Sequence, residues 1–168
     1  VGLKDPKIYL GDTLLYPQSQ PQVKDYFRFV AQEDKIRFTL SGNTIDYSLD
    51  SGSTWTSLAS DTSSPLLSSG ETIMFKATGL TVNNGIGKFF SNGDFDVEGN
   101  IMSLIYGDDF ETATTITNVG QFRSLFDSNS NVINSSGLTL PATTISQDAY
   151  RSMFYNCSNL VTPTELPA

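Results

Sequence analysis

The chain has 168 residues, of which 38% are hydrophobic and only 17% are charged, and its formal net charge is −8. This length suits one ordinary domain, or a small domain followed by a few repeats. An acidic surface is repelled by nucleic-acid phosphates and by anionic membrane surfaces, so we expect no nucleic-acid partner. Because no stretch approaches the ~20 apolar residues of a membrane span, we also expect no membrane insertion.

The sequence contains no histidine and a single cysteine, Cys157. Histidine is the commonest general base and the commonest metal ligand, and the usual serine and cysteine nucleophile systems depend on it. We therefore predict a non-enzymatic protein with no catalytic residue, no metal ligand and no cofactor. A lone cysteine has no partner for an intrachain disulfide, so we expect Cys157 to be a small buried side chain.

Residues 1–24 contain two short apolar runs on either side of Gly11 and Asp12, which predicts a tight β-hairpin. An isolated hairpin is marginally stable in water, so its apolar side chains need a partner surface. We predict an assembly arm that docks through Ile8, Leu10, Leu14 and Leu15. The alternative is an edge hairpin of the same chain's β-domain.

Residues 25–99 hold short runs rich in aromatic and β-branched residues, separated by Gly, Asn, Asp and Ser. Because these turn signals recur about every ten residues, the segment predicts a β-sandwich-like domain. Alternating acids at Asp94, Asp96 and Glu98 suggest either a calcium site or a solvated strand face. We favour the solvated face.

Residues 48–55 read S-L-D-S-G-S-T-W and match the pattern S-x-D-x-G-x-T-W at every fixed position. The motif resembles the Asp-box of sialidases and of other β-propeller and β-sandwich proteins, where it is a hairpin fold element and not a catalytic site. A sialidase would carry several copies, whereas this chain has one. Aspartate can accept hydrogen bonds from turn amides, glycine permits positive φ, and tryptophan can cover the base of the hairpin. We predict a structural role for the fixed residues Ser48, Asp50, Gly52, Thr54 and Trp55.

Residues 100–168 contain a duplication: residues 122–126 (FRSLF) return as residues 150–154 (YRSMF). A weaker match lies at residues 103–106. A period in the twenties is typical of solenoids, in which each unit buries its apolar face on the next. Gln147 follows Thr144 at the spacing of a helix capping box, and apolar residues then recur with the helical period. We therefore predict that each unit forms a short helix, a polar turn and a short extended stretch, and that it ends in the tripeptide Leu-Pro-Ala.

The repeat unit resembles the BspA-type leucine-rich repeat, which is common in surface proteins of Bacteroidetes and in phages that infect them. The resemblance covers about 50 residues at the C-terminal end. In that family the repeats serve adhesion. Residues 7–17 (KIYLGDTLLYP) are also similar to short N-terminal segments of tail and fibre proteins of gut Bacteroides phages, including crAss-like phages.

Together these features predict a mainly β protein, with a β-sandwich-like domain followed by a short leucine-rich-repeat (α/β solenoid) segment. The predicted parts are the arm at 1–24, the β-domain at 25–99 and the repeats at 100–168. The expected function is that of a phage virion fibre or decoration protein, anchored by its N-terminal region. Its expected partners are capsid or tail proteins or further copies of itself, with a host-surface glycan or protein as ligand. The alternatives are a bacterial cell-surface leucine-rich-repeat adhesin and a carbohydrate-binding accessory domain.

Overall fold

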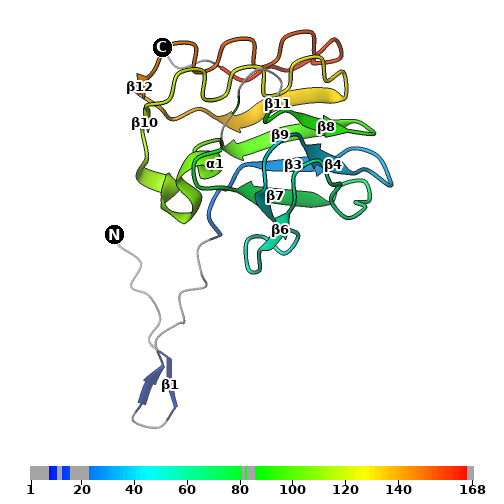
Figure 1. The fold of residues 1–168 in the computed structure, drawn as a ribbon. Coiled ribbons are helices and arrows are strands. Elements are labelled where there is room, and N and C mark those ends of the chain that lie inside the picture. Colours follow the sequence, from blue (N-terminus) through cyan, green and yellow to red (C-terminus); the bar gives the residue numbers. More distant parts are fainter. Residues whose placement is uncertain (1–7, 11–12, 16–22, 81, 83–85, 166–168) are drawn as a thin grey trace.

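The computed structural model describes residues 8–10, 13–15, 23–80, 82 and 86–165, and it is mainly β, as predicted. Six strands form one sheet in the order β11-β9-β3-β7-β5-β6 (Figure 1). Neighbouring strands are antiparallel, except that β11 lies parallel to β9. The strands are β3 (Arg28–Ala31), β5 (Ile45–Ser48), β6 (Thr56–Leu58), β7 (Thr72–Lys76), β9 (Phe95–Asn100) and β11 (Val132–Thr139).

Shorter pairs accompany this sheet. They are antiparallel β4 (Phe38–Leu40) with β8 (Phe89–Ser91), parallel β10 (Thr115–Ile116) with β12 (Thr144–Ile145), and antiparallel β1 (Ile8–Leu10) with β2 (Thr13–Leu15). The β1–β2 pairing agrees with the predicted hairpin, although its turn at 11–12 lies outside the described residues. The helical elements are α1 (Ser103–Tyr106) and the 3-10 helix η1 (Gly107–Thr112). In the described part of the chain, no helix is both long and apolar enough to cross a membrane.

The core is built from phenylalanine rings on the inner face of the sheet. Strand β9 alternates strictly, with Phe95 and Val97 buried and the acids that follow them, Asp96 and Glu98, half-buried. Phe29 on β3 is fully buried, and its ring centroid lies 4.7 Å from that of Phe95 and 4.8 Å from that of Phe38. Large aromatic side chains contribute much of the apolar area that stabilises a small β protein.

The sheet and the core continue past residue 100, where we predicted the repeat segment to begin. Strand β11 extends the sheet beyond β9. The Phe126 ring is fully buried, at 5.8 Å from the ring of Phe29 and 6.0 Å from that of Phe89. The duplicated region therefore supplies part of the same core as the preceding strands.

The short helices that we predicted in the two repeat units are absent. Residues 119–128 and 147–156 form consecutive turns, and helical structure among the described residues is confined to 103–112. Every fourth residue in these turns adopts a left-handed conformation, which interrupts an α-helix. These residues, with φ between 55° and 67°, are Gly120, Ser124, Ser128, Asp148, Ser152 and Asn156.

Gly99 is expected to be the least replaceable glycine of the sheet. Its φ is +76°, and a Cβ atom there would lie 2.0 Å from the carbonyl oxygen of Tyr26. Gly70 has a similar φ of +83° but open space around it, so it is a matched control. We expect Gly99→Ala to cost roughly 3 kcal/mol or more in urea unfolding, and Gly70→Ala about 1 kcal/mol. Equal losses would contradict the close backbone contact.

Candidate functional site

The Asp-box forms the hairpin between β5 and β6, and its fixed residues bind one another. The carboxylate of Asp50 accepts hydrogen bonds from the Thr54 backbone N–H at 2.8 Å and from its hydroxyl at 2.7 Å. Ser48 Oγ donates to the same carboxylate at 2.7 Å and accepts from the Gly52 N–H at 2.9 Å. Trp55 Nε1 donates to the Gly52 carbonyl at 3.1 Å.

These contacts lower the pKa of Asp50 to about 2, chiefly through the Thr54 backbone N–H and then through the Thr54 and Ser48 hydroxyls. A carboxylate held ionised by three donors is a poor proton donor or acceptor near neutral pH. The geometry thus fits the predicted structural role of the motif, which is to hold the hairpin between β5 and β6.

A charged cluster covers the indole ring of Trp55. Lys76 Nζ lies 4.4 Å from the Trp55 ring centroid, and the ring of Tyr26 meets the indole edge-on at 4.8 Å. Lys76 forms an ion pair with Asp108 at 2.8 Å, and the Tyr26 hydroxyl donates to Asp108 Oδ1 at 2.6 Å. A sugar that stacked on this face of Trp55 would have to displace Lys76, which weakens the carbohydrate-binding alternative.

The acids of β9 are half-buried and partnered, whereas we expected a solvated face. Asp96 Oδ2 accepts from Gln32 Nε2 at 3.1 Å and from Asn134 Nδ2 at 3.2 Å, and burial raises the pKa of Asp96. Glu98 pairs with Arg28 at 3.0 Å. No group of three or more candidate ligands able to hold a metal occurs among the residues that the structure describes. These acids therefore join neighbouring strands to one another.

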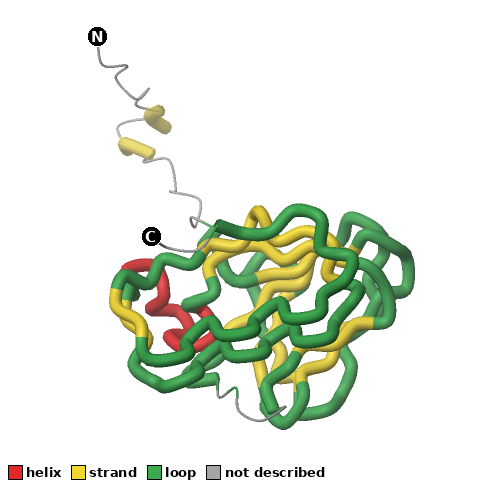
Figure 2. Tube along the Cα trace, turned by 90° about the horizontal axis from the view of Figure 1, so that it is seen from above, coloured by secondary structure: helices red, strands yellow, loops and turns green. Residues whose placement is uncertain are grey.

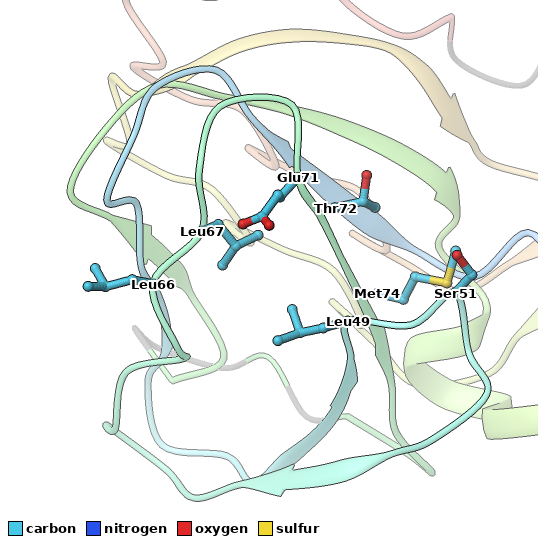
Figure 3. Close-up of a pocket in the computed structure, with 7 residues that line it drawn as sticks. All are labelled: Leu49, Ser51, Leu66, Leu67, Glu71, Thr72 and Met74. Atoms are coloured by element: carbon cyan, nitrogen blue, oxygen red, sulfur yellow. The ribbon is translucent and has the colours of Figure 1, made fainter.

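A pocket of about 240 Å³ opens between the Asp-box hairpin, the loop before β7 and β7 itself (Figure 3). The rim of the pocket is apolar, because the Leu49 and Leu66 side chains lie there and are each 50% exposed. The single carboxylate of the lining belongs to Glu71. It accepts a hydrogen bond from the Ser68 backbone N–H at 2.7 Å, and this bond holds the loop before β7 together. The lining offers no pair of acid and base groups. It consists of Leu49, Ser51, Leu66, Leu67, Glu71, Thr72 and Met74.

The two copies of the duplication form two parallel ribbons of turns, which we name the first ribbon (residues 118–128) and the second ribbon (residues 146–156). Figures 1 and 2 show them side by side. Every even-numbered N–H of the first ribbon from 120 to 128 donates to an odd-numbered carbonyl of the second. These five bonds of 2.8–3.0 Å are Gly120 to Gln147, Phe122 to Ala149, Ser124 to Arg151, Phe126 to Met153 and Ser128 to Tyr155.

Aromatic rings stack in the same register. Phe122 lies on Tyr150 with ring centroids 5.9 Å apart and planes 8° apart. Phe126 lies on Phe154 at 5.2 Å and 5°. Each pair is separated by 28 positions in the sequence, which is the offset of the duplication. Stacked rings of this kind contribute both apolar burial and orientation.

Two other sides of the chain repeat this arrangement. Strand β10 pairs with β12, and β11 pairs with the segment after the second ribbon through Val161 N–H to Ile133 O at 2.9 Å and Ser135 N–H to Thr162 O at 2.8 Å. Two successive turns of the chain therefore lie in register on three sides. The weaker upstream match at residues 103–106 lies in α1 and not in a ribbon.

The upstream edge of the first ribbon is covered by β8 and the residues beside it. Phe89 N–H donates to the Leu125 carbonyl at 3.0 Å, and Asn129 Nδ2 donates to the Phe89 carbonyl at 3.1 Å. Lys88 and Asp127 form a largely buried ion pair at 2.6 Å. These contacts fix the stack on the body of the protein.

Sequence reasoning missed the ribbons, although one signal was present. Gly, Ser, Asp or Asn recurs at every fourth position of both copies, and all except serine are residues that tolerate left-handed backbone. The prediction for Cys157 is confirmed, because the thiol is buried and Sγ lies 3.1 Å from the Phe126 carbonyl oxygen. Burial raises the pKa of this thiol.

Comparisons with protein-family models, with curated proteins and with solved structures found no match to this chain. Among the described residues, the in-register stack is an extended and regular surface.

The stability that Asp50 contributes should depend on pH in a defined direction. Its pKa falls from 3.8 to about 2 on folding, so its contribution is complete above pH 3.8 and is lost as the pH falls toward 2. We expect Asp50→Asn to be less stable than the parent in urea at pH 6, and the difference to shrink below about pH 4. Ser51→Ala, on the same hairpin, should differ from the parent by a constant amount. A pH-independent difference for Asp50→Asn would contradict the hydrogen bonds described.

Equivalent phenylalanines of the two ribbons should differ in their contribution to stability. Phe126 is fully buried, whereas Phe154 is half-buried and covered on one side by Phe126. We expect Phe126→Ala to cost roughly 3–5 kcal/mol and Phe154→Ala about 1–2 kcal/mol in chemical denaturation. Equal costs would mean that the second ribbon is as deeply packed as the first.

Proposed function

We propose that this chain is a non-enzymatic structural protein of a phage virion, a fibre or decoration component whose β-rich body carries a short leucine-rich-repeat stack for adhesion. The observation that carries the proposal is the in-register stacking of the two copies on three sides of the chain. Stacked repeats bury a continuous core and leave an extended surface for a partner.

The use of the carboxylates supports a structural function. Asp50, Glu71 and Asp108 each bind donors of their own chain within a hairpin, a loop or an ion pair. Charge-assisted hydrogen bonds of this kind stabilise local structure. At these three places the carboxylates hold a hairpin, a loop and an ion pair together.

In this proposal the hairpin of β1 and β2 docks on capsid or tail proteins or on another copy of the chain. Figure 1 shows the pair set apart from the main sheet. Lys24 forms an ion pair with Glu111 at 2.9 Å, and this pair attaches the segment around Lys24 to η1. A two-stranded hairpin gains most of its stability from the surface that it meets.

The location of the protein tests the proposal directly. Antibodies against the purified chain are applied to purified phage particles and to uninfected host cells from the native source. Labelling of particles alone is the expected result. Labelling of uninfected cell surfaces would instead establish the bacterial adhesin, and turnover of glycosides by the pure protein would overturn the non-enzymatic assignment.

Removal of residues 1–22 separates assembly from folding, because it keeps Lys24 and its ion pair with Glu111. We expect the melting temperature to change by less than about 2 °C, because in this proposal the hairpin packs on a partner and not on the chain's own body. Incorporation into particles should be abolished. A large drop in melting temperature with incorporation retained would show that the arm belongs to the chain's own sheet.

A further inference from the structure

The outer edge of the second ribbon has backbone donors without acceptors. The five N–H groups equivalent to those that join the ribbons belong to residues 148, 150, 152, 154 and 156, and none finds an acceptor among the described residues. The carbonyl groups of this ribbon are already used. Those at odd positions from 147 to 155 accept from the first ribbon, and those at even positions from 146 to 154 close the turns. The edge therefore offers a row of donors and no acceptors.

A row of unpaired backbone donors restricts which edges can pair with it. An ordinary β-strand edge alternates donors and acceptors and can pair with an identical edge. A donor-only edge cannot, because two such edges would bring N–H groups face to face. Two copies of this chain therefore cannot pair through their second ribbons. The carbonyl edge of the first ribbon is also closed to a second copy around Leu125, because β8 covers it there.

The side chains at this end of the stack are apolar, like their equivalents in the first copy, but they are more exposed. Ile116 of β10 is 2% exposed, whereas its register partner Ile145 of β12 is 54% exposed. The same contrast holds in the ribbons, where Phe122 and Phe126 are fully buried and their partners Tyr150 and Phe154 are half-buried. Exposed apolar residues gathered at one end of a molecule indicate an interaction surface.

We propose that this edge binds a polypeptide coil that presents backbone carbonyl oxygens at every second residue. The coil lies parallel to the second ribbon, and its apolar side chains, spaced four residues apart, cover Tyr150 and Phe154. The first ribbon already binds the second in this manner, through five hydrogen bonds and two ring stacks. The inference rests on the proposed function, because it names the class of partner that the repeat stack would hold.

The partner so defined is a protein segment and not a glycan. A ribbon of turns places one carbonyl acceptor at every second residue, as residues 147–155 show, and this spacing matches the row of donors. The Tyr150 hydroxyl is also buried without a partner among the described residues, which leaves a further polar group in the outer layer unsatisfied.

The test joins a probe to the full chain, namely the sequence of residues 143–168 repeated once after Ala168. Backbone amide exchange of the parent supplies the reference: the amides of Phe122 and Phe126 should be protected, and those of Tyr150 and Phe154 should exchange freely. In the extended chain we expect exchange at Tyr150 and Phe154 to slow by at least about tenfold, together with a higher melting temperature.

A matched control carries the same extension with serine in place of the two added residues equivalent to Tyr150 and Phe154, and it should show much weaker protection. Unchanged exchange at Tyr150 and Phe154 in the extended chain would overturn the proposal. Parent dimers that protect these amides would overturn it as well, because they would show a donor edge pairing with its own copy. These readouts do not depend on particle labelling, so the proposed function and this inference can fail separately.

Discussion

The rest of the structure depends on the burial of one set of phenylalanine rings between the sheet and the first ribbon. Phe29 on β3 and Phe126 on the first ribbon meet in this core, and both are fully buried. A single sheet with one apolar face needs a second layer to cover it. The duplicated region supplies part of that layer, so its fold and that of the preceding strands depend on each other.

The direction of the backbone hydrogen bonds gives the stack two different ends. The first ribbon receives a bond from Phe89 at its upstream edge and donates five bonds to the second ribbon at its downstream edge. The body therefore covers one end of the stack. The opposite end keeps both its donors and its apolar residues, which is why we place the partner there.

Ion pairs tie the pieces of the chain together despite the excess of acidic residues. Lys88 binds Asp127 of the first ribbon, Lys76 binds Asp108 of η1, and Arg28 binds Glu98 across two strands. The lysine and arginine side chains are partly buried, so these pairs are less screened by solvent than ordinary surface pairs. Few of the basic groups in the described part of the chain remain to attract an anionic partner, in keeping with the low isoelectric point of about 4.3.

Local sequence determined the features that need only neighbouring residues. The β1–β2 pairing, the alternation of β9 and the hydrogen bonds within residues 48–55 follow from turn residues and from the two-residue period of strands. The 28-residue spacing of the duplication equals the separation of the rings that stack. Tertiary hydrogen bonds complete the choice between helix and ribbon. Gln121 of the first ribbon donates to the Leu80 carbonyl. Alternate backbone N–H groups of this ribbon reach the neighbouring copy instead of their own preceding turn. A helical pattern and a ribbon pattern place the same apolar residues inward, so the apolar pattern does not distinguish them. The left-handed residues at every fourth position interrupt the helix, and the acceptors of the adjacent copy hold the ribbon.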